Sequence, residues 1–314
     1  MTPRRKTSYT KPWLSCQDQL RLLASRGLAI GDADRAATTL SHLEYYRFSG
    51  YCLAFEVSRH EFAPGVSFDD VYSAYEFDRG LRRLLTEALE WIEIDFRTVL
   101  AHEFAQRHGP FGHRKATLFA AGFDHALWIE RARETARRSS EVFVTHYRGK
   151  YQEFPDLPIW ALVEILSFGS VSKLFKGMLR DDQRPVGRRY ARQPSDLSSW
   201  LHHLSYMRNS CAHYARVWDR VHPIAPKRPA GNAWSTRQIP QNNRVFMTLL
   251  VLASLLSRVD ALAVCRSSWA RRVERHISDS TPRVQHAWSQ MGIPSDWTDH
   301  PEWRQLCVAQ GEVQ

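Results

Sequence analysis

A single long amphipathic pattern, from Val71 to Phe104, limits the possible folds of this chain more than any other feature. Apolar side chains recur there every three or four residues, which is the period of an α-helix, over roughly nine turns. Ser67 is expected to cap this helix and Gly109, followed by a proline, to end it. Because no long segment alternates apolar and polar residues as a strand does, the predicted fold class is all-α.

Other periodic segments predict shorter helices. We expect helices over residues 17–25, 32–43, 125–147, 159–168, 170–179, 195–220 and 243–263, with further short ones near 267–276 and 282–290. Asp32 is the expected N-cap of the second helix, Gly50 is expected to end a helix, and Gly169 is expected to form a turn between two helices. The predicted organisation is a flexible basic arm over residues 1–12, a helical domain over 13–222, a loop over 223–241 and a C-terminal helical extension over 242–314 packed on the same domain.

The chain is strongly basic, with a formal net charge of +10 and a pI of about 9.6. Only 7 of its 43 basic residues are lysines, which leaves 36 arginines. The planar guanidinium group suits phosphate recognition and stacking on bases, so this composition indicates a polyanionic partner, most simply nucleic acid. A GC-rich genome also raises arginine over lysine, and that explanation stays open.

The length and the cysteines exclude several classes of protein. A chain of 314 residues can bury a large core without disulfides or a metal. The five cysteines are scattered and no pair has CxxC spacing, which argues against structural zinc and fits a reducing compartment. No apolar run approaches the roughly 18 to 20 residues of a membrane span, and no apolar segment follows the basic N-terminus as in a secretory signal. We therefore expect a cytoplasmic protein with no membrane partner, no metal and no cofactor.

One face of the predicted helix over residues 195–220 carries polar side chains. At about 100° per residue, His202, Tyr206, Asn209 and His213 fall within about 60° of one another, and Arg216 lies on the flank. This face combines groups that can exchange protons near neutral pH with groups that can hold a phosphate.

Arg208 is predicted to point elsewhere, into the sector of the same helix that its leucines occupy. A buried arginine is costly unless it is paired. On the long helix, Glu93 lies at the edge of the apolar stripe, and Arg97 follows it by one turn. We therefore predict that Glu93 faces Arg208 across the two helices.

These side chains fit RNA cleavage without a metal. A base must deprotonate the 2′-hydroxyl, an acid must protonate the leaving 5′-oxygen, and a cation must stabilise the charge on the phosphate. The imidazole of His213 can do either proton transfer, the guanidinium of Arg208 can stabilise the charge, and Asn209 can orient the imidazole or hold a phosphate oxygen. Spacing by itself leaves open a structural arginine and a surface histidine, since Arg97 and His102 have a similar spacing.

Several stretches, in order along roughly residues 8 to 222, resemble the bacterial Abi family, the AbiD/AbiF-like abortive-infection proteins. They include LEYYRFSGY at 43–51, YEFDRGLRRLLTEALEWIEIDFRT at 75–98, HGPFG at 108–112, PIWALVEILSFGSVSKLF at 158–175 and SWLHHLSYMRNSCAHYARVWDR at 199–220. A family of this kind is built on the HEPN fold, a helical bundle, here with additional N- and C-terminal helices. Its signature is Arg-Asn-x-x-x-His, which Arg208, Asn209 and His213 match.

The resemblance implies a metal-independent endoribonuclease whose active site forms where two copies of the motif meet, and hence a homodimer. It makes Arg208 and His213 the principal catalytic pair with Asn209 in support, and Glu93 and Arg97 match a Glu-x-x-x-Arg element of the family's first long helix. Members are associated with phage defence, and AbiF-like members can be paired with a structured non-coding RNA. RNA is therefore the implied partner. Toxin–antitoxin chemistry with a nucleotidyltransferase is a weaker alternative, because HEPN proteins also pair with such enzymes.

Further candidates for RNA binding are Tyr46, Arg47, Arg216, Lys11 and Arg5. The first two can instead pack in a core or a turn, and the basic arm can simply be solvated. Two supporting site residues, His202 and Tyr206, complete the set. The main alternative to a ribonuclease is a non-catalytic RNA-binding protein, in which the Arg-Asn-x-x-x-His motif is structural or grips RNA.

Overall fold

In the computed structural model, the described residues are 8–259, 263–284 and 287–307. The chain divides into two compact units, Met1–Phe77 with Thr281–Gln285 and Asp78–Ser280 with His286–Gln314. The boundary falls within the long helix α4 (Phe68–His108), and each unit is described by itself. The predicted all-α class is confirmed, since the one sheet of the described residues is a hairpin of β1 (Glu56–Ser58) and β2 (Glu61–Phe62), too short for a visible alternation.

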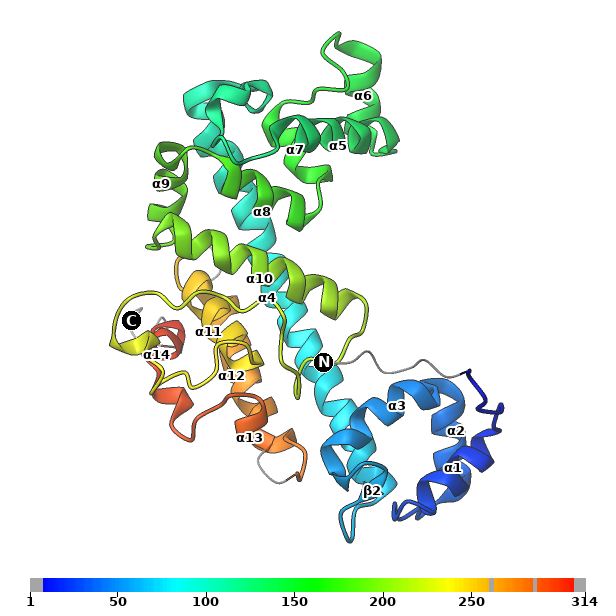
Figure 1. Ribbon diagram of the computed structural model, residues 1–314. Coiled ribbons are helices and arrows are strands. Elements are labelled where there is room, and N and C mark those ends of the chain that lie inside the picture. Colours follow the sequence, from blue (N-terminus) through cyan, green and yellow to red (C-terminus); the bar gives the residue numbers. More distant parts are fainter. Residues whose placement is uncertain (1–7, 260–262, 285–286, 308–314) are drawn as a thin grey trace. The chain divides into compact units, whose positions relative to one another are not determined.

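The first unit contains three short helices and the start of α4 (Figure 1). These helices are α1 (Cys16–Ala24), α2 (Ala33–Leu43) and α3 (Tyr45–Cys52), and a short turn of 3-10 helix, η1 (Leu53–Phe55), precedes the hairpin. The predicted caps are confirmed: the Asp32 carboxylate accepts from the Arg35 N–H at 2.9 Å, and the Ser67 hydroxyl accepts from the Asp70 N–H at 3.2 Å. The prediction that Gly50 ends a helix is wrong. Gly50 lies inside α3, whose buried face offsets the modest cost of an internal glycine.

The second unit is built on the rest of α4 and on α10 (Pro194–Ala212), which crosses it (Figure 1). The helices between them are α5 (His125–Arg138), α6 (Val142–Lys150), α7 (Ile159–Ile165), α8 (Phe168–Gly177) and α9 (Arg180–Arg189), with short 3-10 turns η2 (Gly112–Arg114) and η3 (Ala116–Leu118). Helices α8 and α9 pack on α10, and α5 packs on α7 and α8.

The C-terminal helices belong to the same unit. They are α11 (Val245–Leu256), α12 (Ala263–Ser280), α13 (Ala287–Gln290) and α14 (Pro301–Cys307), with 3-10 turns η4 (Asn232–Trp234) and η6 (Trp297–Asp299). Helix α11 is buried along its whole length and packs against α10 and α14. The Trp269 indole of α12 donates to the Leu84 carbonyl of α4 at 2.8 Å. None of the helices in the described residues is both long and apolar enough to cross a bilayer.

Two predicted helix boundaries between residues 125 and 179 are wrong. The single helix predicted over 125–147 is two helices, because the chain becomes extended at Ser139 and the Arg148 guanidinium donates to the Arg137 carbonyl at the end of α5. The turn predicted at Gly169 lies earlier, before the N-cap Ser167. Gly169 is instead in the first turn of α8, where a Cβ would lie 3.0 Å from the Ser205 hydroxyl of α10. A glycine there lets the two helices approach closely.

Helix α10 ends at Ala212, eight residues before the predicted end at 220. His213 is its C-cap and Tyr214 follows with a φ of 57°, in the left-handed region. The Ala215 N–H donates to the Ser210 carbonyl at 2.9 Å, and the Tyr214 N–H donates to the Cys211 carbonyl at 3.0 Å. These two bonds define a Schellman motif, which usually has glycine where this chain has a tyrosine.

Four histidines of the second unit are buried, and burial lowers the pKa of each below the ordinary 6.5: to about 4 for His113, about 4 for His203 and about 3 for His222, and in the same direction for His300. His203 is held by the Ile224 carbonyl and the Thr248 hydroxyl. Neither ring nitrogen of His113 has a hydrogen-bond partner among the described residues. For His113 the nearby carboxylate of Asp156 opposes the effect of burial without cancelling it.

These histidines predict a loss of stability in mild acid. Below pH 6.5 the unfolded chain takes up protons that the folded chain does not accept, so the free energy of unfolding falls as the pH decreases toward 4. A His113→Phe variant is expected to lose less stability between pH 7.5 and pH 5 than the wild type, by roughly 2 kcal/mol. Urea denaturation at the two pH values measures this, and equal losses in both proteins would contradict it.

Candidate functional site

The last turn of α10 presents the Arg-Asn-x-x-x-His motif at the surface. Arg208 and Asn209 are exposed in that turn, and His213 is exposed directly after it. The expectation that Arg208 is buried is wrong, because 47% of its side chain is accessible. Its Cα lies beside the buried stripe of α10, but the long aliphatic stem carries the guanidinium out to solvent.

Glu93 of α4 holds the Arg208 guanidinium in place. Arg208 Nε lies 3.5 Å from Glu93 Oε2, so the predicted pairing across the two helices is confirmed. The other oxygen of Glu93 binds Arg97 one turn further along α4, and Arg97 also donates to the Val163 carbonyl in α7. Only 12% of the Glu93 side chain and 10% of the Arg97 side chain are exposed. A nearly buried carboxylate thus links a nearly buried arginine to an exposed one.

Asn209 is also within reach of the same guanidinium. An Nη1 of Arg208 donates to Asn209 Oδ1 at 3.4 Å, a long bond. Together with the Glu93 contact, this restricts the orientations of Arg208 while part of its guanidinium stays open to solvent.

Asp78 fixes the segment that follows His213. One oxygen of this fully buried carboxylate accepts from the Val217 N–H at 3.0 Å and from the Trp218 N–H at 2.9 Å. Its other oxygen forms an ion pair with Arg82, one turn along α4. The turn that carries His213 is therefore held at both ends, by α10 before it and by Asp78 after it.

The predicted polar face is only partly assembled. His202, Tyr206 and Asn209 line one groove of about 1170 Å³ between α5, α8 and α10. His213 does not line it, because α10 ends and the chain turns at Tyr214. Arg216 is half-buried in the segment after that turn. Sequence periodicity placed all of these on one helix because no glycine or proline marks the end of α10.

The remaining candidates for RNA binding lie in the first unit. Tyr46 and Arg47 are exposed on α3, with 82% of Tyr46 accessible, and Lys11 is exposed before α1. Arg5 lies outside the described residues. Trp13, also strongly exposed, is a stacking surface two residues after Lys11, and periodicity does not mark it because it belongs to no periodic segment.

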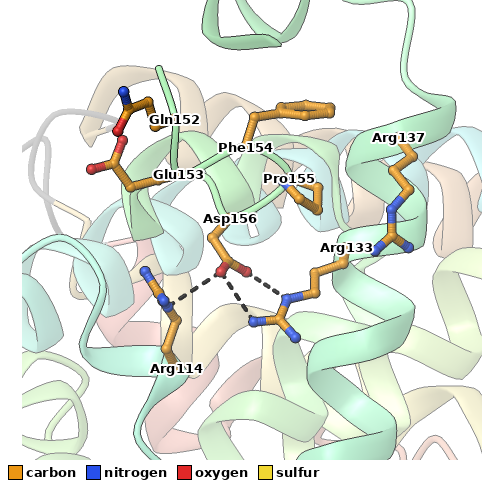
Figure 2. Close-up of a pocket in the computed structure, with 8 residues that line it drawn as sticks. All are labelled: Arg114, Arg133, Arg137, Gln152, Glu153, Phe154, Pro155 and Asp156. Atoms are coloured by element: carbon orange, nitrogen blue, oxygen red, sulfur yellow. Dashed lines mark hydrogen bonds and ion pairs between the residues drawn. The ribbon is translucent and has the colours of Figure 1, made fainter.

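A second cluster of arginines in the second unit surrounds a carboxylate (Figure 2). Arg133 donates to both oxygens of Asp156, at 2.7 and 3.0 Å, and Arg114 lies 3.2 Å from the same carboxylate. Burial raises the pKa of Asp156, but Arg133 and Arg114 outweigh this effect and lower it. Arg137 makes no contact with Asp156 in Figure 2 and pairs instead with Glu130. These guanidinium groups are paired with carboxylates of the same chain, so we assign a structural role to this pocket of about 430 Å³.

No group of three or more His, Cys, Asp or Glu side chains among the described residues is arranged to hold a metal ion.

Comparison with known proteins identifies one family. A family model described as Abi-like protein matches residues 38–219, more than half of the chain. The matched range contains Glu93, Arg97 and the whole Arg208–His213 motif, and it ends before α11. No curated protein and no solved structure matches the chain.

Proposed function

Since this chain belongs to the Abi-like protein family, we propose that it is an effector of abortive-infection defence that cleaves RNA without a metal, using Arg208 and His213. The observation that carries the proposal is the end of α10, where an exposed guanidinium anchored on a nearly buried carboxylate lies five residues before an exposed imidazole. Exposed ion pairs contribute little to stability, so stability alone does not account for this contact. Holding the guanidinium in position for a ligand does.

The proposed reaction is attack of the RNA 2′-hydroxyl on the adjacent phosphate. The new O–P bond forms as the bond to the 5′-oxygen breaks, which leaves a 2′,3′-cyclic phosphate and a 5′-hydroxyl. His213 removes the proton of the attacking hydroxyl or protonates the leaving oxygen. Arg208 neutralises the charge that develops on the phosphate, and Asn209 contacts a phosphate oxygen or the imidazole. Glu93 acts through Arg208, as a positioning residue.

One copy of the motif supplies one imidazole, whereas this reaction needs both a base and an acid. A second copy in a homodimer would supply the other proton-transferring group, so we include a dimer with facing motifs in the proposal. Light scattering of the purified protein tests this part, and a mass of one chain both with and without RNA would contradict it.

The wild-type protein tests the proposed activity directly. Incubated with single-stranded RNA in excess EDTA, it is expected to produce fragments that end in a 2′,3′-cyclic phosphate and begin with a 5′-hydroxyl. Tight RNA binding without any cleavage, with and without EDTA, would favour the second candidate, a non-catalytic RNA-binding protein, which the net charge of +10 also supports. Sequencing the RNA that co-purifies identifies any bound non-coding RNA.

A further inference from the structure

The groove between α5, α8 and α10 adjoins the motif. Of the residues proposed for catalysis, only Asn209 lines it. Its volume of about 1170 Å³ exceeds the roughly 300–1000 Å³ of clefts that hold one small molecule. All of its lining residues lie in the second unit. The groove therefore has room for a ligand longer than a single small molecule.

Five apolar residues that line the groove, two of them aromatic, are together called its floor. Phe123, Leu127 and Trp128 come from α5 and the segment before it, and Ile165 and Leu166 come from the end of α7. Leu127 is 46% exposed, so part of its apolar surface is open to a ligand in the groove. A floor of this kind favours flat, weakly hydrated groups such as nucleobases.

Three cationic side chains line the groove: Arg131 of α5 and Lys173 and Lys176 of α8. All three are exposed, and none of their charged groups has an ion-pair or hydrogen-bond partner among the described residues. The only carboxylate among the described residues that line the groove is Asp124, which caps α5 by accepting from the Leu127 N–H. The groove therefore carries three cations against one carboxylate, and that carboxylate is paired with none of them among the described residues.

The other arginines of α5 make the contrast clear. Arg133 pairs with Asp156, Arg137 with Glu130 and Glu134, and Arg138 with Glu134. Arg131 is the α5 arginine that faces the groove, and it is the one without a carboxylate partner. Its guanidinium is thus free to bind an external anion.

Building on the proposed function, we propose that this groove binds a single-stranded segment of the RNA substrate. Phosphates lie on Arg131, Lys173 and Lys176, and unstacked bases lie on the apolar floor. The segment leads to Asn209, which lines the groove and belongs to the motif. A duplex is disfavoured because its bases are paired and stacked, so it cannot use the floor.

Binding to a probe that cannot be cut tests this groove separately from catalysis. The probe is a fluorescent single-stranded 2′-O-methyl RNA of roughly ten nucleotides, which lacks the attacking hydroxyl. A Lys173→Glu/Lys176→Glu variant is expected to bind it at least about 10-fold more weakly and with a smaller salt dependence. The matched control is Lys115→Glu/Arg188→Glu, two exposed cations outside the groove, which changes the net charge equally. Equal weakening in both variants would overturn the proposal.

The floor has its own test. Leu127→Asp is expected to weaken binding of the probe, whereas Val142→Asp, which changes an exposed aliphatic side chain of α6 outside the groove, is not. Duplex RNA of the same length, or an acidic peptide, that binds as tightly as the probe and loses affinity in the same variants would also overturn the proposal. If the wild type never cuts RNA but these differences in binding are found, the proposed nuclease activity is wrong and the proposed RNA-binding groove is supported. If cleavage occurs and the groove variants bind normally, only the groove fails.

Discussion

His213→Ala is expected to slow RNA cleavage by about 10²–10⁴-fold, the usual effect of removing a general acid or base. The imidazole lies at the surface directly after α10, and its removal breaks no hydrogen bond made by a described side chain. We therefore expect the thermal unfolding temperature and the affinity for uncleavable RNA to stay close to those of the wild type. Single-turnover rates in EDTA, measured with enzyme in excess over a labelled RNA, give the effect on the chemical step.

The matched control for this variant is His102→Ala. His102 is an exposed histidine of α4 that follows Arg97 at the same spacing as His213 follows Arg208. It lies in neither the motif nor the groove, so its replacement is expected to leave the rate unchanged. Equal rates for the wild type and His213→Ala would remove His213 from the mechanism.

Asp78→Ala is expected to lower the free energy of unfolding by about 3–5 kcal/mol, the cost of breaking a buried ion pair by removing one partner. Arg82 would keep a buried charge, and the N–H groups of Val217 and Trp218 would lose their acceptor. Asp78→Asn keeps an oxygen for these N–H groups and is expected to cost less. Because this carboxylate holds the segment after His213, RNA cleavage is expected to fall in both variants.

Urea denaturation measures the loss in stability. Asp181→Ala provides the comparison, because its carboxylate pairs with Arg184 on the surface of α9, where such a pair contributes at most about 1 kcal/mol. If Asp78→Ala does not fold, the loss in free energy of unfolding is compared between Asp78→Asn and Asp181→Ala, and the larger loss is expected at Asp78. Similar small losses for Asp78→Ala and Asp181→Ala would show that Asp78 does not anchor the turn.

Helix ends and faces that depend only on neighbouring residues could be predicted from the sequence. The start of α4 follows from Ser67, whose hydroxyl caps it, and its end follows from Gly109, which has a φ of 74°. The contact of Glu93 with Arg208 could also be predicted, because helical periodicity places Glu93 at the edge of the apolar stripe of α4 and turns Arg208 toward the leucine sector of α10, although the guanidinium itself is more exposed than that position suggests.

The end of α10 could not be predicted in this way. A tyrosine at the left-handed position carries no sequence signal for a helix end, and Asp78, which holds the chain beyond it, is 139 residues from Val217 in the sequence. The same holds for the groove, since Arg131 and Lys173 meet there only through the packing of separate helices. Both features depend on tertiary contacts that local patterns do not encode.

Chemical rescue decides whether the His213 imidazole transfers a proton during RNA cleavage. The single-turnover cleavage rate of His213→Ala in EDTA is measured with increasing free imidazole. We expect the rate to rise with imidazole concentration and the products to carry the same 2′,3′-cyclic phosphate ends as those of the wild type. A variant that cuts as fast as the wild type without imidazole, or a wild type that does not cut RNA at all, would contradict it.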